Sequence, residues 1–189
     1  AVGLWLGPRS HLVHYPVRAG ELLNVVAVTE GGAALQGWNR PVCSAALLPS
    51  FARWTKGCQS LLEGAENWRS WSLFRLAGLR KWSVGRVALL GDAAHPVLPY
   101  LAQGAALAIE DASVLAACLA GTQDLPCAYG RYEAARRYRT ARVGRLSQHL
   151  GRLYHLCGPL RLVRNAILAQ RDPDTALRRF DWLYREARR

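Results

Sequence analysis

The sequence predicts a fold of the mixed α+β / α/β class, in which an antiparallel sheet is followed by a strand-turn-helix unit and then by C-terminal helices. Three observations predict it. Runs of β-forming residues separated by turn residues fill residues 1–29, a short apolar run at Val87–Leu90 leads through Gly-Asp into a helical segment, and the composition is helical beyond residue 126. With 189 residues, 51% of them hydrophobic, the chain is long enough to bury a core.

The first 29 residues contain three runs typical of strands, Val2–Leu6, His11–Val17 and Leu22–Val28. The segments between them, Gly7–Ser10 and Arg18–Glu21, contain glycine and other residues that favour turns. Connections this short join antiparallel neighbours, because parallel strands need a long crossover. We therefore expect a β-meander.

Alternation along the second of these strands places His11 and Tyr15 on one face, and Leu12 and His14 on the other. At roughly 3.3 Å per residue, His11 and Tyr15 are roughly 13 Å apart and are candidates for two points of one pocket. A histidine there can take up or release a proton near neutral pH. The alternative is a histidine at the edge of the core and a packed tyrosine. We expect His14 to be structural.

Residues 41–71 predict one or two short helices. Ser44 is a candidate N-cap, and Pro49 is expected to break or begin a helix. Trp54 and Trp68 belong to an aromatic-rich stretch that we expect to pack in the core.

The next unit is a strand, a polar turn and a helix. Val87–Leu90 is too short for a helix and suits a strand buried on both faces, which Gly91 and Asp92 end. An aspartate at the carboxyl end of a strand can hold a ligand hydroxyl. Gly104 lies near the predicted helix start, where unpaired amides favour an anionic or electron-rich group. The alternative is a βα unit that serves packing alone.

Beyond residue 126 we expect one long helix over Cys127–Leu156, ended by Gly158-Pro159. A second helix over residues 160–169 and a short one over residues 180–185 should pack back through apolar side chains. Gly144 lies inside the long helix and costs roughly 1 kcal/mol relative to alanine. We expect close packing to be its reason.

The net charge of +12 is uneven, because residues 131–189 contain 15 arginines and 5 acidic residues. A cationic tail of this kind can bind nucleic acid, but no nucleic-acid motif accompanies it, and we do not expect such a partner.

His95 has no further ligand at metal spacing, so no metal is expected. Five scattered cysteines, no signal peptide and no unbroken apolar span predict a cytoplasmic protein without a membrane segment.

Residues 85–112, GRVALLGDAAHPVLPYLAQGAALAIEDA, resemble the second flavin-binding motif of the FAD-dependent aromatic hydroxylases, the group A flavoprotein monooxygenases, in their salicylate or 6-hydroxynicotinate hydroxylase-like branch. Two further segments are similar to the same family. They are the predicted sheet around HLVHYPV, residues 11–17, and the helical stretch beyond Tyr129.

The resemblance implies a role for each matching residue. Asp92 holds the ribityl chain of FAD, and Pro99 borders the flavin and the substrate. The amides around Gly104, Ala105 and Ala106 face the pyrimidine edge of the flavin ring, where the reduced flavin concentrates negative charge.

The resemblance also implies that His11 and Tyr15 bind a phenolic substrate and assist its deprotonation. The implied activity is hydroxylation of a phenolic or hydroxylated aromatic acid with FAD as cofactor and NAD(P)H and dioxygen as co-substrates. The implied division is a partial substrate-binding domain over 1–75, the second FAD-binding motif over 76–125 and a C-terminal helical region over 126–189.

No GxGxxG unit for the adenosine part of FAD occurs in the chain. The sequence therefore looks like the C-terminal half of such an enzyme, and a missing N-terminal FAD-binding half is an expected partner. The alternative is a partial or degenerate chain that acts as a binding or structural module without FAD.

Overall fold

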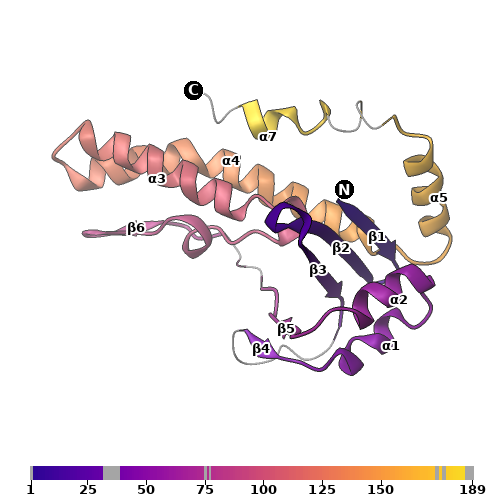
Figure 1. The fold of residues 1–189 in the computed structure, drawn as a ribbon. Helices are drawn as coiled ribbons and strands as arrows, with labels where there is room; N and C mark the ends of the chain where they lie inside the picture. The colour runs from indigo at the N-terminus through magenta and orange to yellow at the C-terminus, as the bar shows by residue number, and fades with distance from the viewer. Residues whose placement is uncertain are drawn as a thin grey trace. The chain divides into compact units, whose positions relative to one another are not determined.

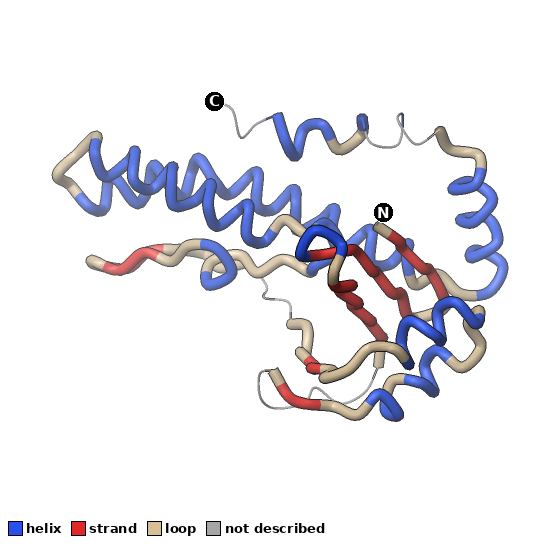
Figure 2. The backbone as a smooth tube through the Cα atoms, in the orientation of Figure 1, coloured by secondary structure: helices blue, strands red, loops and turns tan. Residues whose placement is uncertain are grey.

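The computed structural model describes residues 2–31, 39–74, 76, 78–172, 175 and 178–185, and Figures 1 and 2 show its elements. The chain divides into two units, each built from two stretches of sequence. Unit 1 comprises Ala1–Ser72 and Arg152–Arg171, and unit 2 comprises Leu73–Gly151 and Asp172–Arg189. The expected domain boundary after residue 75 falls on a residue outside the described part.

Unit 1 contains the predicted meander. Strands β1 (Gly3–Gly7), β2 (Ser10–Val17) and β3 (Leu22–Thr29) pair antiparallel in the order β1-β2-β3 (Figure 1). His11 lies opposite Leu6 on one side and Val28 on the other. The structure confirms the three predicted strands. They could be predicted because alternation and turn residues are local signals.

Short helices follow the sheet in unit 1, as expected for residues 41–71. Leu12 of β2 packs in a buried core with Phe51, Cys58 and Leu62 of these helices. Pro49 lies in the first turn of a helix, as predicted, but Ser44 does not cap one. The elements are η1 (Arg18–Gly20), β4 (Arg40–Pro41) paired with β5 (Arg69–Ser70), η2 (Ser44–Ala46), α1 (Leu48–Phe51) and α2 (Lys56–Glu63).

The strand predicted at Val87–Leu90 is shorter and more exposed than expected. Strand β7 (Val87–Ala88) pairs antiparallel with β6 (Ser83–Val84), and the Val87 side chain is 65% exposed. Gly85 turns the hairpin with a φ of 59°. The carbonyls of Arg86 and Leu89 accept hydrogen bonds from the tyrosine hydroxyls of Tyr129 and Tyr132, at 3.2 Å each, rather than from a neighbouring strand. The prediction of a strand buried on both faces was therefore wrong.

Unit 2 continues through two short 3-10 turns, η3 (Gly91–Ala93) and η4 (Pro99–Leu101), into helix α3 (Gly104–Ala120). Gly104 is the first residue of that helix, as predicted. The long helix α4 (Leu125–Tyr154) confirms the expected element within two residues at either end.

The C-terminal helices α5 (Gly158–Ala169) and α7 (Asp181–Arg185) differ in how they pack. Leu183 of α7 is buried with Leu107 of α3 and Val143 of α4. The side chains of Leu160 and Leu162 in α5 are more than half exposed, so the expectation that this helix packs back through them was wrong. Among the described residues, no helix combines the length and the apolar character that crossing a bilayer requires.

Candidate functional site

The turn η3 lies against helix α3 because Gly91 has no side chain. Its φ is 58°, and a Cβ atom on it would lie 3.0 Å from the Cβ of Ala108. The Gly91 amide donates a hydrogen bond of 2.9 Å to Oδ2 of Asp111 on α3. The backbone immediately before Asp92 is therefore fixed to the helix at two points.

This anchoring brings Asp92 to the N-terminus of α3. A Cβ atom on Gly104 would lie 3.7 Å from Oδ1 of Asp92 and 3.9 Å from a methyl carbon of Val97. Gln103 precedes the helix but does not cap it with its side chain. Asp92 itself is exposed and has no hydrogen-bond or ion-pair partner among the described residues. The structure thus places a carboxylate acceptor beside a row of helix-start amide donors.

The turn that carries Pro99 packs on one face of α4. Leu98 O accepts a 2.6 Å hydrogen bond from the Ser147 hydroxyl, and the ring of Tyr100 lies against Gly151. Pro99 begins η4 and is exposed, and Ala102 ends that turn in the left-handed region with a φ of 52°. These contacts hold the turn at Pro99 against α4, directly before α3 begins at Gly104.

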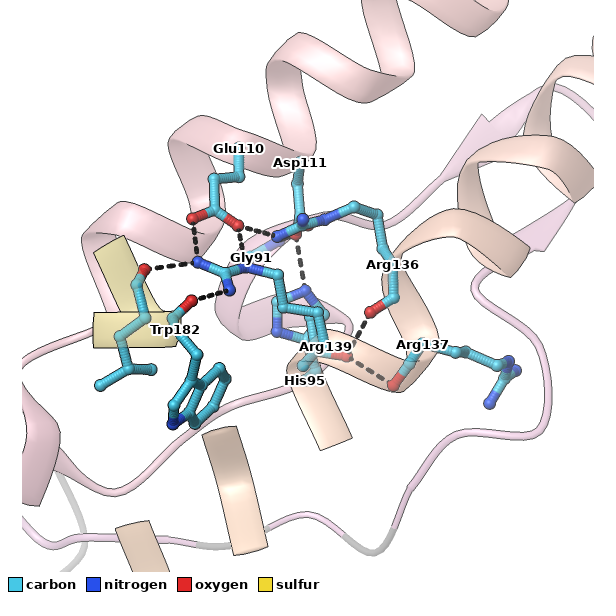
Figure 3. Close-up of polar contacts among 10 residues, drawn as sticks. Gly91, His95, Glu110, Asp111, Arg136, Arg137, Arg139 and Trp182 are labelled. Carbon is cyan, nitrogen blue, oxygen red and sulfur yellow. Dashed lines mark hydrogen bonds and ion pairs between the residues drawn. The ribbon is translucent and has the colours of Figure 1, made fainter. Parts of the chain in front are cut away.

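A buried ionic network connects the turn after Gly91 to helices α3 and α4 (Figure 3). Asp111 is 0% exposed; its Oδ2 accepts from His95 Nε2 at 2.6 Å, and its Oδ1 accepts from Arg136 Nε at 2.7 Å. Burial alone raises the pKa of Asp111, but the hydrogen bonds from His95, Arg136 and the Gly91 amide outweigh it and hold the pKa below its usual value. His95 therefore links the turn to α3 through Asp111.

Glu110 extends the network to the C-terminal helix. It accepts from Arg136 Nη2 at 2.7 Å and from Arg139 Nε and Nη2 at 2.6 Å each. Arg139 also donates to the carbonyls of Trp182 at 3.4 Å and Leu183 at 2.8 Å. Burial raises the pKa of Glu110, but the two arginines outweigh burial and lower it. Glu110 and Asp111 are thus both engaged in ion pairs with arginines of α4.

In unit 1, the two predicted substrate residues have different environments. The His11 side chain is buried, with only 3% of the residue exposed, and its Nδ1 lies 2.8 Å from Nε2 of His155. Nδ1 of His155 lies 2.6 Å from Oε1 of Glu30. Burial first, and then the charge on His155, lower the pKa of His11 to about 4. Tyr15 lies four residues further along β2 and is 36% exposed.

The residues around Asp92 and Gly104 fit the ribityl and ring portion of FAD. A free carboxylate accepts hydrogen bonds from hydroxyl groups, while helix-start amides donate to carbonyl or anionic groups. Gly104 is needed neither for a positive φ nor for packing, since its nearest neighbours would be at ordinary contact distance from a Cβ atom. No cluster of metal-ligating side chains occurs among the described residues.

Sequence reasoning missed the partners on distant segments. The link between His11 and His155 joins residues 144 positions apart, and no spacing rule could pair them. For Asp111 a signal existed: the adjacent acids at 110 and 111 match two arginines spaced by three on α4, Arg136 and Arg139.

The fold is shared with solved flavin enzymes. A salicylate hydroxylase substrate complex matches with a TM-score of 0.74 and 28% identity, covering 98% of this chain and 47% of that one. Klebsiella pneumoniae HpxO complexed with FAD and uric acid matches with a TM-score of 0.79 and 26% identity, covering 94% and 46%. The chain therefore has the fold of the matching halves of these flavin-binding enzymes.

The family follows from the sequence profile of the FAD binding domain, which matches residues 44–146, more than half of the chain. The chain belongs to this FAD binding domain family.

Characterised relatives are aromatic hydroxylases. 3-Hydroxybenzoate 6-hydroxylase of Polaromonas naphthalenivorans (strain CJ2) is 38% identical over 197 residues, covering 97% of this chain and 46% of the relative. 3-Amino-4-hydroxybenzoate 2-monooxygenase PtnB3 of Streptomyces platensis is 40% identical, with 95% and 46% covered. Salicylate hydroxylase of Pseudomonas putida is 34% identical, with 96% and 43% covered. The chain spans a little under half the length of these relatives.

Proposed function

We propose that the chain forms the flavin-ring half of an FAD-dependent monooxygenase that hydroxylates a phenolic or hydroxylated aromatic acid with NAD(P)H and dioxygen. One observation carries the proposal: the carboxylate of Asp92, without a partner among the described residues, lies beside the start of α3 at Gly104, which has no side-chain cap. The names of the relatives, which include hydroxybenzoate and salicylate hydroxylases, support the substrate class.

In this proposal the chain's own residues bind and orient the cofactor. Asp92 accepts hydrogen bonds from ribityl hydroxyls, the amides of Gly104, Ala105 and Ala106 donate to the electron-rich edge of the ring, and Pro99 borders the ring. Bound FAD supplies the redox chemistry that activates dioxygen once NAD(P)H has reduced it. The fixed backbone at Gly91 preorganises these groups, which lowers the cost of binding.

His11 and Tyr15 are proposed to bind the phenolic substrate, with His11 accepting its proton. A phenolate is more electron-rich than the phenol, so its ring carbon reacts more readily with an electrophilic oxygen. We assign residues 1–75 to the substrate-binding domain, 76–125 to the second FAD-binding motif and 126–189 to the C-terminal helical region.

The adenosine end of FAD requires a further segment, and we propose an N-terminal half with a GxGxxG unit as the partner. The described hairpin β6-β7 exposes the apolar side chains of Val84 and Val87, which supports a partner on that hairpin.

The test is FAD retention. Asp92→Ala removes hydrogen bonds to a charged acceptor, so we expect FAD to bind about 10-fold to 100-fold more weakly, measured from flavin absorbance after gel filtration and by fluorescence titration. Glu66→Ala, which removes an exposed carboxylate from unit 1, is the matched control and should retain FAD fully. Undiminished retention by Asp92→Ala would overturn the proposed role. A protein that stays colourless with added FAD would instead support the non-catalytic alternative.

A further inference from the structure

We propose that His95 is a positioning residue for FAD: together with Asp111 it clamps both ends of the turn that carries Asp92, and so sets where the Asp92 carboxylate lies. The inference rests on the proposed function only in that the group held by Asp92 is FAD. The clamp itself is independent of any ligand, and all of its residues belong to unit 2.

The turn from Gly91 to His95 is tightly closed, with Asp92 on its exposed side. The amides of Ala94 and His95 both donate to the carbonyl of Gly91, at 3.0 Å each. Gly91 and Ala94 are buried, whereas Asp92 is exposed and has no hydrogen-bond or ion-pair partner among the described residues. The position of the Asp92 carboxylate therefore depends on the contacts that hold the rest of the turn.

Both ends of this turn are bound to the same oxygen atom. Oδ2 of the buried Asp111 accepts from the Gly91 amide at 2.9 Å and from Nε2 of His95 at 2.6 Å. Its other oxygen, Oδ1, accepts from Nε of Arg136 at 2.7 Å, so the carboxylate cannot rotate without breaking a hydrogen bond. One fixed oxygen thus holds the residue before Asp92 and the residue three positions after it.

The clamp also fixes the turn in register with helix α3. Gly104, Ala108 and Asp111 are spaced by four and by three residues, so they share one face of the helix. A Cβ atom on Gly104 would lie 3.7 Å from Oδ1 of Asp92, and one on Gly91 would lie 3.0 Å from Cβ of Ala108. At 1.5 Å per residue, Asp111 lies roughly 10 Å along the helix from Gly104. A turn anchored at Asp111 therefore brings Asp92 to the amide donors at the helix start.

The His95 side chain takes part in the clamp through one ring nitrogen. The Asp111 carboxylate can only accept, so Nε2 of His95 carries the proton of the 2.6 Å hydrogen bond. Nδ1 is buried and has no hydrogen-bond partner among the described residues. The ring, 11% exposed, packs against Trp82 at 4.9 Å between ring centroids. An apolar side chain at this position can therefore keep the packing on Trp82 while it loses the bond to Asp111.

The first test is a double-mutant cycle on FAD affinity. His95→Leu removes the donor to Asp111, so we expect FAD to bind about 3-fold to 30-fold more weakly in a fluorescence titration. In the Asp92→Ala background the same change should have no further effect, because no carboxylate is left to be positioned. A merely structural His95 would weaken binding by the same factor in both backgrounds, and this result would overturn the proposal.

A second pair of variants separates the hydrogen bond from the bulk of the ring. His95→Gln places an amide nitrogen near the position of Nε2 and should restore most of the affinity that His95→Leu loses. Equal affinities of the two variants would overturn the role of the Nε2 bond. His149→Leu, which replaces an exposed histidine of α4, is the matched control and should bind FAD as the native chain does. Urea unfolding of each variant verifies that it is folded during the titration.

The clamp can also be tested without FAD. Hydrogen exchange in the ligand-free chain should show the amides of Gly91, Ala94 and His95 exchanging faster in His95→Leu than in the native chain, with those inside α3 unchanged. Unchanged exchange in the turn would overturn the clamp and leave the proposed function standing. If Asp92→Ala binds FAD as well as the native chain does, the proposed role of Asp92 is wrong, and the exchange rates still decide whether the clamp exists.

Discussion

At the scale of single residues, two aspartates of unit 2 show how burial separates a ligand group from a structural one. Asp92 is exposed and without a partner among the described residues, whereas Asp111 is fully buried and accepts hydrogen bonds from three groups. Both follow apolar runs in the sequence, so composition alone could not tell them apart. The difference lies in the donors that the fold brings to each.

Removal of Asp111 should be strongly destabilising. Asp111→Ala leaves the buried Arg136 with one carboxylate fewer and leaves His95 without an acceptor, so we expect a loss of about 3–5 kcal/mol in the free energy of unfolding by urea. Asp92→Ala should change it by less than about 0.5 kcal/mol. Equal losses in the two variants would contradict the assignment of Asp111 as a structural residue and Asp92 as a ligand-binding one.

His11 should make stability depend on pH. Its pKa is about 4 in the folded chain, against an ordinary value of 6.5 for the unfolded chain, so the unfolded state binds more protons between these values. Stability therefore rises with pH from about 4 to 6.5, by on the order of 3 kcal/mol, and then levels off. In His11→Gln this contribution should disappear from urea unfolding curves measured at pH 4.5 and pH 7.5. His149→Gln, at an exposed position on α4, should retain it. If the free energy of unfolding changed with pH equally in the native protein and in His11→Gln, His11 would not be the cause of the pH dependence.

At the scale of elements, the turn at residues 97–101 is held by small residues along one face of α4. Gly144, Ser147 and Gly151 recur at helical spacing and contact Val97, the Leu98 carbonyl and Tyr100 in order. The close approach is at Gly151, where a Cβ atom would lie 2.5 Å from the Tyr100 ring. At Gly144 a Cβ atom would lie 3.9 Å from Val97, an ordinary contact, so close packing is not the reason for that glycine.

The two glycines should respond with opposite signs to the same substitution. Gly151→Ala forces the Tyr100 ring or the helix to move, and we expect a loss of about 1–3 kcal/mol in thermal or urea unfolding. Gly144→Ala should stabilise by about 0.5–1 kcal/mol through helix propensity. Replacing the ring by a smaller side chain in Tyr100→Leu should reduce the loss of stability caused by Gly151→Ala. A Gly151→Ala variant as stable as Gly144→Ala would contradict this prediction, because it would show that the Tyr100 ring moves aside at little cost.

The elements also show which sequence signals suffice. The meander and the long helix were predictable, because alternation, turn residues and helical composition are local. The strand at Val87–Leu90 was not, because an apolar run predicts burial but cannot specify what covers it. In the structure, Tyr132 of α4 donates to the carbonyl of Leu89, Tyr129 donates to that of Arg86 just before the run, and Val87 stays exposed.

At the scale of the whole molecule, the excess of positive charge is partly structural. Arg136, Arg139 and Arg164 are all buried, and each is bonded to carboxylates or carbonyl oxygens. The sequence could place the charge beyond residue 130 but not its partners. The site followed the same rule: Asp92 and Gly104, close in sequence, were predictable as neighbours, while the contact of His11 with His155 was not.

The division of both units into two stretches of sequence has a consequence for synthesis. Unit 1 needs His155 beside β2, and the core of unit 2 is completed by Leu183 against Leu107 and Val143. Neither unit can close until the ribosome has made the segment that follows α4. The core of the meander and the first helices can form earlier, because its residues all precede α4. The contact of His11 with His155 and the core of unit 2 have to wait, so folding of both units is completed late in synthesis.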